Sequence, residues 1–310
     1  MRIEQLRYFL SLAKTQSLNK TGLEFYTTHQ GISKAIRQLE DEIGAPLFTR
    51  SSKGMFLTNE GHMFLPVAEK CVRDLHDIQL KIRYANRQQD LEGILQIWGT
   101  PLTNATLMPG LFEDFSTLYP KIRYQVDEAD TLDILRSVSL HRNLLGSALV
   151  LHDPRYHTFY EPYLHEVICY PLQQDEYVCL AHKSLPLAER KQIRFEEFAA
   201  YPVTTLIPDT NNADHPIKRL LRELGHTELS LSTQTSRLIA QAITSGKYVA
   251  LGSRRGLDES AYLDDDIVAI PFEEDLSLDI MLVTNTHPQL NEISQAFVEL
   301  ARENAPETIS

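Results

Sequence analysis

The chain has 310 residues, of which 43% are hydrophobic, so it is long enough for two or three packed domains. No hydrophobic run approaches the ~20 residues of a membrane span, and the opening residues lack a small-residue cleavage site, so we expect neither a membrane partner nor a signal peptide. The net charge of −12 is unevenly spread: residues 1–60 hold eight basic and six acidic residues, a net of +2, whereas residues 61–310 hold 22 and 36, a net of −14. The negative net charge of the whole chain therefore does not exclude nucleic-acid binding by the N-terminal segment.

The first helix is marked by apolar residues at helical spacing, namely Leu6, Phe9, Leu10 and Ala13. We expect Asn19 to cap a short second helix over residues 20–25 through its side-chain oxygen. Gly22 lies inside that second helix, where a missing side chain permits close approach of a neighbouring helix.

A third helix is predicted after Thr28, which can act as its N-cap. Its apolar stripe has spacings of 4, 3 and 4 residues and consists of Ile32, Ile36, Leu39 and Ile43. Gly44 then supplies a left-handed stop. The opposite face carries donors and acceptors that can read base edges or hold phosphates, and these are His29, Gln30, Ser33, Lys34 and Arg37. Such a helix, preceded at a short turn by another, suits the major groove of DNA.

Two short β-prone runs follow, residues 47–48 and 55–57, and a polar turn with Arg50 and Lys53 lies between them. This pattern predicts a hairpin wing whose tip reaches the minor groove or a phosphate. The alternative is an ordinary three-helix bundle with a solvated polar face, and the basic hairpin directly after the third helix weighs against it.

These residues carry a resemblance to a known family. The stretch TTHQGISKAIRQLEDEIGAPLFTRSSKGMFLTNEGHMFL (Thr27 to Leu65) and the opening EQLRYFLSLAKTQSLNKTG resemble the N-terminal domain of LysR-type transcriptional regulators. The matching features are Ser33, Lys34, the IRQLE run, GAPLF, Arg50 and LTNEG. The chain departs from the family at Thr21-Gly22, where a pair of alanines is usual, and at Thr28-His29-Gln30, where Ser-Gln-Pro is frequent. The resemblance implies a regulator that binds double-stranded DNA.

A long connecting helix is expected after Thr58, its cap. Apolar or small residues recur along it at alternating spacings of 4 and 3, namely Phe64, Ala68, Cys71, Leu75, Ile78, Ile82 and Ala85. This is the seam of a two-stranded coiled coil, so we predict a homodimer. The alternative is a helix that packs on its own chain. The resemblance also implies dimerisation through this helix, and we expect a second pairing through the sensor region to give a homotetramer.

From Gly93 onward, strands and helices alternate, which is typical of parallel βαβ units. Strands are predicted at residues 94–98, 124–126, 176–182, 248–253 and 280–285. A polar loop is expected after the first of them. Helices are predicted at residues 107–120, 132–140, 216–226, 236–246 and 293–301.

This region resembles the LysR-type sensor region, which is similar in turn to periplasmic solute-binding proteins. The resemblance implies an α/β fold of two lobes, lobe one of residues 91–164 plus 270–310 and lobe two of residues 165–269. We therefore expect a winged helix-turn-helix over residues 1–60, a dimerisation helix over residues 61–90 and an effector-binding domain over residues 91–310. The alternative for the last part is a solute-binding or protein-interaction module without a small-molecule effector.

Several polar residues lie at predicted strand ends or helix starts, where exposed amides favour anions or polar oxygens. These candidates for effector binding are Thr100, Thr103, Asn104, Thr131, Thr204, Thr205 and Arg237. The resemblance places Thr100 and Thr131 at effector-contacting positions, although Ala129 and Leu144 replace a common glycine and aspartate nearby. The alternative is that each threonine only caps a helix. We predict a small polar or anionic effector, with RNA polymerase as a further partner.

The sequence gives no support for an enzyme, because it has no GxSxG, phosphate loop, HExxH or dinucleotide fingerprint. The three cysteines, Cys71, Cys169 and Cys179, are widely spaced and have no CxxC or Cys/His pattern. This usage favours a reducing compartment and argues against disulfides and structural zinc. We therefore expect a cytoplasmic protein without a metal or other cofactor.

Overall fold

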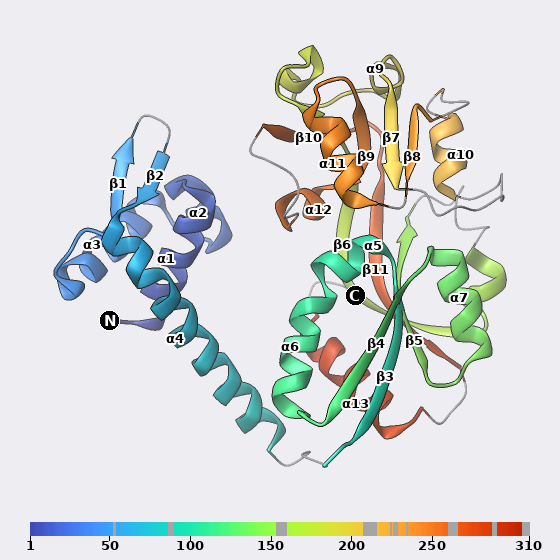
Figure 1. The fold of residues 1–310 in the computed structure, drawn as a ribbon, viewed down its shortest axis with the longest axis horizontal. Coiled ribbons are helices and arrows are strands. Elements are labelled where there is room, and N and C mark those ends of the chain that lie inside the picture. The colour runs from blue at the N-terminus through green and yellow to red at the C-terminus, as the bar shows by residue number, and fades with distance from the viewer. Residues whose placement is uncertain are drawn as a thin grey trace. The chain divides into compact units, whose positions relative to one another are not determined.

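The computed structural model describes residues 1–51, 54–85, 90–152, 160–206, 216–223, 225, 229–233, 235–259, 266–286 and 290–305. The chain divides into two compact units, Met1–Gln88 and Gln89–Ser310 (Figure 1). Within these described ranges no helix is long and apolar enough to cross a membrane. The same residues contain no cluster of His, Cys, Asp and Glu side chains that could hold a metal ion.

The first unit is helical with one small hairpin. Its elements are α1 (Ile3–Thr15), α2 (Leu18–Glu24), α3 (His29–Ile43), β1 (Phe48–Ser51), β2 (Gly54–Leu57) and α4 (Asn59–Tyr84). The helices and the antiparallel β1–β2 hairpin confirm the predicted winged helix-turn-helix. Their common core is apolar and consists of Leu6, Phe9, Leu12, Ile32, Ile36, Leu39, Leu47, Phe48 and Ala68.

The caps explain where these helices begin. Thr28 Oγ1 accepts a hydrogen bond from Gly31 N at 3.1 Å, and Thr58 Oγ1 accepts one from Gly61 N at 2.9 Å, so both predicted caps are confirmed. The predicted cap of α2 was wrong. Ser17 Oγ accepts from Lys20 N at 3.3 Å, and Asn19 lies within the helix. The reason is that α1 ends at a left-handed residue, so the next helix begins sooner than its polar spacing indicated.

The second unit combines strands and helices. Its strands are β3 (Gly93–Gly99), β4 (Ile122–Glu128), β5 (Leu144–Leu151), β6 (Val167–His182), β7 (Val203–Leu206), β8 (Leu231–Thr233), β9 (Val249–Ser253), β10 (Ile267–Pro271) and β11 (Ser277–Asn285). Its helices are α5 (Pro101–Thr106), α6 (Met108–Leu118), α7 (Thr131–Leu140), η1 (Pro186–Glu189), α9 (Phe195–Ala199), α10 (Pro216–Glu223), α11 (Ser236–Thr244), α12 (Arg254–Glu259) and α13 (Glu292–Glu303). Helix α5 replaces the polar loop expected after the first strand.

In the described residues the strands form one mixed sheet in the order β4-β3-β5-β11-β6-β9-β7-β8, with β10 also paired to β6. Parallel pairing is present, as the alternation of strands and helices predicted, between β3 and β4. Strand β3 also lies parallel to β5, and β7 lies parallel to β8 and β9, although β5, β7 and β8 were not predicted as strands. The long strands β6 and β11 are antiparallel to their neighbours, which the simple βαβ prediction missed.

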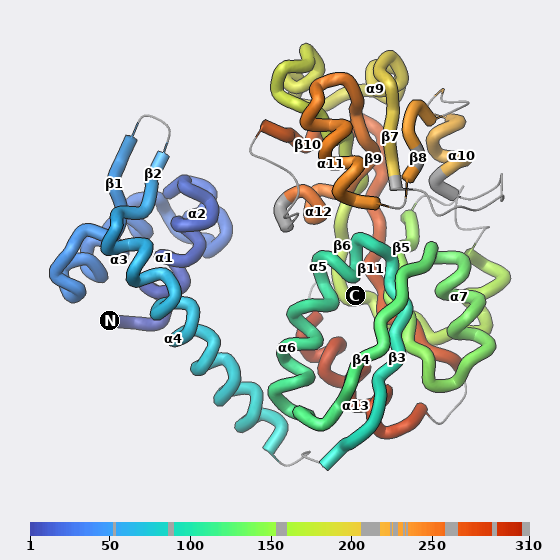
Figure 2. The backbone as a smooth tube through the Cα atoms, in the orientation of Figure 1, coloured from blue at the N-terminus to red at the C-terminus, as the bar shows by residue number. Residues whose placement is uncertain are grey.

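Strand β6 joins two lobes (Figure 2). Its first part, through Glu176, pairs with β11, and its remainder pairs with β9 and β10. We use "lobe one" for β3–β5, β11, α5–α7 and α13, and "lobe two" for β7–β10 and α9–α12. At the junction Tyr177 N donates to Leu276 O at 3.0 Å, so the two connecting segments lie side by side.

Helices cover both faces of the sheet in lobe one (Figure 1). On one face, Phe115 of α6 packs edge-on against Phe297 of α13 with ring centroids 5.2 Å apart. On the other face, α7 packs against β5, and Gly146 makes this close approach possible because a Cβ there would lie 2.5 Å from Ile134 Cγ2. Helices thus pack on both faces of the sheet in lobe one, and this packing supports the strand ends near the lobe-one candidates for effector binding.

Candidate DNA-binding and effector sites

Helix α3 separates its side chains as the sequence predicted. Ile32, Ile36 and Leu39 are buried in the core of the first unit. The polar set on the other side is exposed, except that Ser33 is half-buried: His29, Gln30, Lys34 and Arg37. Ile43, the last member of the predicted stripe, is exposed, because the helix ends at Gly44 in the left-handed conformation expected for it.

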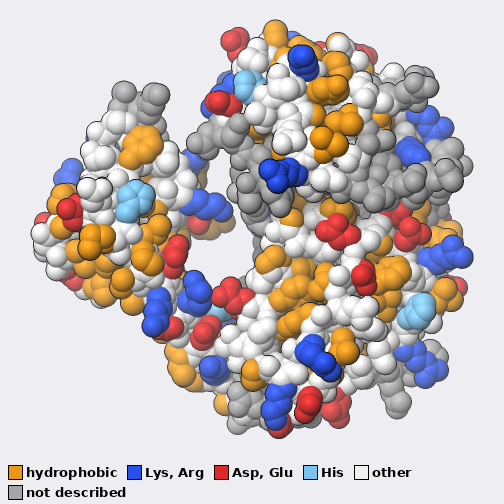
Figure 3. Space-filling model, in the orientation of Figure 1, with side chains coloured by type: hydrophobic (Ala, Val, Ile, Leu, Met, Phe, Trp, Pro, Cys, Tyr) orange, Lys and Arg blue, Asp and Glu red, His pale blue; other side chains and the backbone are white. Residues whose placement is uncertain are grey.

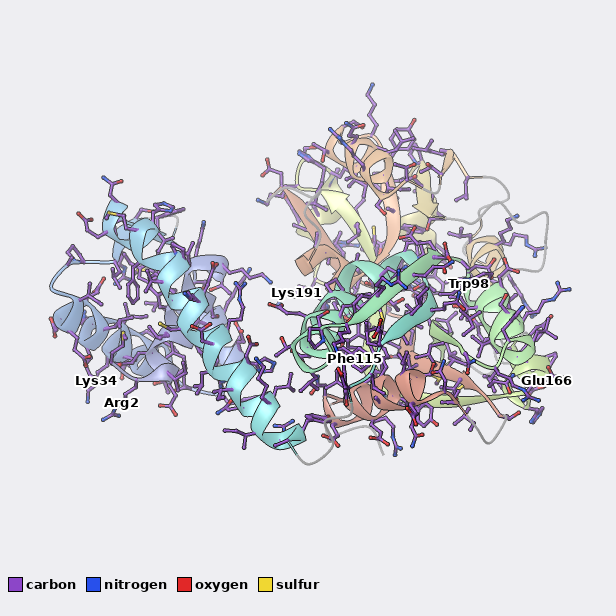
Figure 4. The ribbon with its side chains drawn as sticks, turned by 60° about the horizontal axis from the view of Figure 1, so that its bottom comes forward. Arg2, Lys34, Trp98, Phe115, Glu166 and Lys191 are labelled. Carbon is purple, nitrogen blue, oxygen red and sulfur yellow. The ribbon has the colours of Figure 1, made fainter. Side chains whose placement is uncertain are left out.

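Two exposed cations of α3 have no described contact that helps to hold the first unit together. In the described part of the chain, neither Lys34 nor Arg37 forms an ion pair or a side-chain hydrogen bond. Figure 4 shows Lys34 on the surface of the unit. Arg50 on β1 is also exposed. These cations are therefore available to a partner that carries negative charge.

Gly22 fixes the approach of α2 to α3. A Cβ at Gly22 would lie 2.8 Å from Thr27 O and 3.4 Å from His29 N, which is too close for any larger residue without movement. Thr27 N in turn donates to Gly22 O at 2.8 Å. The predicted close approach at this glycine is confirmed, and it holds the start of α3 firmly against α2.

The wing is attached to the end of α1. Arg50 pairs with Met55 across the hairpin, and Met55 N donates to Gln16 O at 2.9 Å. Gly54 has φ of 139° and no space for a Cβ, which would lie 2.7 Å from Gln16 O. Arg50 thus extends from an anchored strand, whereas Lys53 lies outside the described residues.

Helix α4 uses only the first part of its predicted seam within its own unit. Ala68 is buried in the core and Phe64 packs against it. Farther along, Cys71, Ile78 and Ile82 are exposed, with Ile82 at 70%. The helix therefore presents an apolar surface over its second half that its own unit does not cover.

Lobe one brings the first three effector candidates together at the end of β3. Thr100 caps α5, because its Oγ1 accepts from Thr103 N at 3.3 Å. Thr103 is fully buried, and its hydroxyl donates to Thr100 O at 3.1 Å. Asn104 folds back toward Gly99, and its Oδ1 is buried without a hydrogen-bond partner among the described residues. Thr100 therefore caps a helix, and Asn104 has an acceptor that those residues leave unused.

Thr131 has a different role from the one expected. It is the first residue of α7, and the cap is Asp130, whose Oδ1 accepts from Asp133 N at 2.9 Å. The Thr131 hydroxyl bridges to β5 by donating to Leu149 O at 3.1 Å and accepting from Leu149 N at 3.2 Å. Thr131 therefore ties α7 to the sheet.

The lobe-two candidates are also placed differently. Thr204 and Thr205 lie inside β7 rather than after a strand, because the strand continues to Leu206. Thr205 Oγ1 donates to Leu251 O at 3.3 Å. Thr204 is fully buried, and no described residue forms a hydrogen bond with its Oγ1. Arg237 lies on the exposed first turn of α11.

Sequence reasoning missed two further polar residues. Ser147 is fully buried on β5 and pairs with Gly99 across the sheet, and its Oγ has no hydrogen-bond partner in the described part of the chain. Its signal was a lone hydroxyl within the apolar run LLGSALVL. Asp175 lies at the junction on β6, where Oδ1 accepts from Glu176 N at 2.8 Å and the buried Oδ2 has no partner among the residues described. No sequence pattern distinguished Asp175 from other acidic residues.

Buried phenols adjoin this junction. Burial raises the pKa of Tyr160, and Tyr177 and Asp130 add to the rise. Burial also raises the pKa of Tyr177, with a further contribution from the Asp175 carboxylate. Both phenols therefore stay protonated at neutral pH, so they can donate hydrogen bonds but carry no charge.

The second unit shows mixed charge on the side that is visible in Figure 3. There the described Asp and Glu side chains lie among Lys and Arg. Residues 89–310 hold 17 basic and 33 acidic residues, a net of −16, and this acidic excess would repel a polyanion. The features that suit DNA are therefore those of the first unit, the α3 face and the wing.

The two units together define a DNA-binding transcriptional regulator with a separate ligand-binding domain. The family model for the bacterial regulatory helix-turn-helix protein of the lysR family matches residues 3–62. The model for the LysR substrate binding domain matches residues 88–306. The chain therefore belongs to the LysR family of transcriptional regulators.

Similar proteins agree with this assignment. The uncharacterized HTH-type transcriptional regulator YybE of Bacillus subtilis is 29% identical over 150 residues, which cover 47% of this chain and 51%, about half, of that protein. The HTH-type transcriptional regulator SsuR of Burkholderia cenocepacia is 26% identical over 219 residues, or 69% of this chain and 67% of that protein. The crystal structure of full-length BenM shares the fold, with a TM-score of 0.55, 18% identity and coverage of 98% of this chain and 96% of that chain.

Proposed function

We propose that α3 reads DNA in the major groove and that the wing holds the backbone. In this proposal Gln30 and Ser33 contact base edges, with Thr28 and His29 beside them at the helix start. Cations hold phosphates or the minor groove, and these are Lys34, Arg37, Arg50 and Lys53. The observation that carries the proposal is the exposed polar face of α3, whose lysine and arginine have no partners in the described residues. We also propose that the protein acts in the cytoplasm, where its DNA partner lies.

The test compares substitutions that should act differently on DNA binding. Lys34→Ala should weaken binding to all sequences and reduce the salt dependence by about one phosphate contact. Gln30→Ala should relax the preference at one base pair by ~1–3 kcal/mol. Lys14→Ala removes the same charge from exposed α1 and serves as the control. Normal binding of both α3 variants to genomic fragments selected by the wild type would show that this face is wrongly assigned.

We further propose that the protein is a homodimer through α4 and that sensor domains pair again to give a homotetramer. The exposed apolar residues Cys71, Ile78 and Ile82 support the first pairing, because a single chain leaves them in water. Two joined reading heads can bind a two-fold site, which one winged helix cannot. RNA polymerase is the further protein partner that a DNA-bound regulator would contact.

For the second unit we propose a small polar or anionic effector held by residues of the two lobes. Three buried groups support this, because Asn104 Oδ1, Ser147 Oγ and Thr204 Oγ1 have no hydrogen-bond partner in the described residues. Leaving such groups unsatisfied costs about 1–3 kcal/mol each, so a ligand that pairs with them would be stabilising. Asp175 Oδ2 also has no partner in the described residues, and a carboxylate oxygen accepts hydrogen bonds, so we expect the ligand to present a donor. Hydroxy acids and amino acids combine a polar, anionic group with such a donor.

A thermal-shift screen of hydroxy acids and amino acids tests the effector proposal. A ligand that stabilises the wild type should stabilise Thr204→Val and Ser147→Ala less. Thr284→Val is the matched control, because its hydroxyl is also buried without a partner but lies near the end of β11 remote from lobe two. Equal stabilisation of all four proteins would place the ligand elsewhere. If no small molecule stabilises the protein, a protein-interaction module becomes the better account.

A further inference from the structure

Tyr26 has an unusual backbone conformation. Among the described residues, the non-glycine residues with positive φ are Gln16 at 53° and Tyr26 at 50°. Glycine and asparagine adopt this left-handed conformation far more easily than a bulky residue, whose Cβ approaches the next carbonyl oxygen. Gln16 has a reason within the chain, since its carbonyl oxygen accepts from Met55 N of the wing. Tyr26 requires another explanation.

The Tyr26 side chain does not stabilise the fold by packing. Its exposed fraction is 99%, so it buries almost no surface. Its backbone N–H donates to Leu23 O at 3.2 Å, a bond that asparagine or glycine at this position would keep. The left-handed strain is therefore not offset by burial. Strain of this kind commonly marks a functional position, and the described residues supply no partner that buries the ring.

The position of Tyr26 indicates what that partner is. Tyr26 lies in the turn between α2 and α3, two residues before the Thr28 cap, so their Cα atoms are at most ~7 Å apart. The Thr27–Gly22 hydrogen bond holds this turn against α2, so Tyr26 has a fixed place beside the start of the reading helix. A major groove is ~12 Å wide, so its bordering phosphates lie within reach of a tyrosine at the mouth of the groove.

We propose that Tyr26 contacts the DNA backbone, with its phenol hydroxyl donating a hydrogen bond to a phosphate beside the groove that α3 enters. The inference rests on the proposed docking of α3. Tyrosine hydroxyls are among the groups that bind DNA phosphates, and such contacts fix the register of the protein without reading sequence. The contact orients the N-terminal end of α3, where Gln30 is expected to meet a base.

The proposed contact differs from that of a lysine. A neutral hydroxyl displaces no counterion, so loss of the Tyr26 contact should lower affinity without changing the salt dependence. Loss of Lys34 should lower both. Because a phosphate contact is independent of sequence, Tyr26 substitutions should weaken selected and unrelated DNA equally. The unchanged salt dependence distinguishes Tyr26 from a lysine that holds a phosphate, and the stability of the variants distinguishes it from a residue that only maintains the fold.

A protein partner is the competing explanation. Leu23 is 77% exposed and three residues before Tyr26, so the two could form one apolar patch. DNA is favoured because Tyr26 directly precedes the reading helix, whereas Leu23 belongs to α2. Leu23→Ala therefore serves as the matched control and should bind DNA like the wild type.

The experiment measures binding of the full chain to a genomic duplex selected by the wild type and to an unrelated duplex, over a range of salt. Tyr26→Phe should weaken both by roughly five- to tenfold with an unchanged salt slope. Tyr26→Asn should weaken binding similarly while raising the unfolding temperature, because it relieves the strain. A structural role predicts the opposite sign for stability.

Several results would overturn the proposal, and they are distinguishable. If Tyr26→Phe binds normally while Lys34→Ala shows its expected loss, Tyr26 does not contact DNA although α3 docks as proposed. If Lys34→Ala also binds normally, the docking of α3 itself is wrong. If Tyr26→Phe and Leu23→Ala both bind DNA normally but lower transcription with purified RNA polymerase, the patch serves a protein.

Discussion

The two units use their candidate binding side chains differently. On α3, the side chains expected to bind DNA are exposed, and neither Lys34 nor Arg37 has a partner in the described residues. In the second unit, most of the candidate hydroxyls are already hydrogen-bonded to the chain. Thr103 bonds to the carbonyl of Thr100, and Thr131 bonds to the backbone of Leu149. Only some of the second unit's candidates, such as Thr204, remain unsatisfied.

This difference shows which residues the fold itself requires. An exposed polar side chain without an internal partner can be removed at little cost to stability, so its role is sought in a complex. A buried hydroxyl with two backbone partners contributes to the fold whether or not it also meets a ligand. A buried hydroxyl without a partner destabilises the folded chain, and a ligand can reverse that cost. Substitutions should separate these three groups.

The largest effect is expected on the exposed apolar surface of α4, which resembles α3 in having no partner within its unit. Ile82→Asp would place two carboxylates in the proposed dimer seam, where desolvation is costly. We expect a monomer in light scattering at micromolar concentration and at least a roughly 100-fold loss of DNA affinity. Unfolding of the first unit should be unaffected, because Ile82 is 70% exposed.

The control for this prediction is Lys70→Asp, which reverses a charge on another side of α4. It should remain dimeric. A wild-type protein that is monomeric at micromolar concentration would contradict the dimer directly, and the exposed isoleucines would then need a different partner.

The next largest effect is expected from a comparison of two threonines in the second unit, one whose hydroxyl is hydrogen-bonded and one whose hydroxyl is not. Thr131→Val removes two hydrogen bonds and leaves the N–H and C=O of Leu149 without that partner, so the free energy of unfolding should fall by about 2–3 kcal/mol. Thr204→Val removes a hydroxyl that has no partner, so it should be neutral or stabilising. Chemical denaturation of the two variants measures both.

Equal destabilisation of the two variants would contradict this division, because it would mean that the Thr204 hydroxyl is satisfied in solution. A stabilised Thr204→Val with a weakened response to ligand would instead support the effector proposal. The comparison therefore distinguishes a residue of the fold from a residue of the site.

The sequence predicted the first unit well because its signals are local. The spacing of Ile32, Ile36 and Leu39 defines one helix face, and Thr28 and Gly44 mark its ends within one turn. The error at Asn19 came from a conformation that a polar pattern does not specify, the left-handed Gln16, after which Ser17 already caps the helix. Periodicity thus predicted the elements more reliably than their first residues.

The second unit was harder to predict because its signals depend on distant segments. Strand β6 pairs with β11, about a hundred residues away, and its antiparallel direction cannot be deduced from either run alone. The Ser147 hydroxyl lacks a hydrogen-bond partner in the described residues because of how β3, β5 and α5 pack together, which no single segment of the sequence shows. Thr204 was expected to follow a strand but lies inside β7, because β-branched threonines extend a strand as readily as they follow one.

The smallest effect is expected from substitutions at two glycines of lobe one. Gly110 lies in α6, and a Cβ there would meet nothing within 4 Å. Gly110→Ala should therefore raise the free energy of unfolding by ~0.5–1 kcal/mol, because alanine loses less backbone entropy in a helix. Gly146 faces α7, and its Cβ would lie 2.5 Å from Ile134 Cγ2, so Gly146→Ala should destabilise the lobe by separating α7 from β5. Both changes add one methyl group to the same lobe, so opposite signs in chemical denaturation would come from the surroundings of the added methyl. If Gly110→Ala also destabilised the protein, the added methyl group would meet another surface in solution. The proposed pairing of sensor domains would supply such a surface if it used α6.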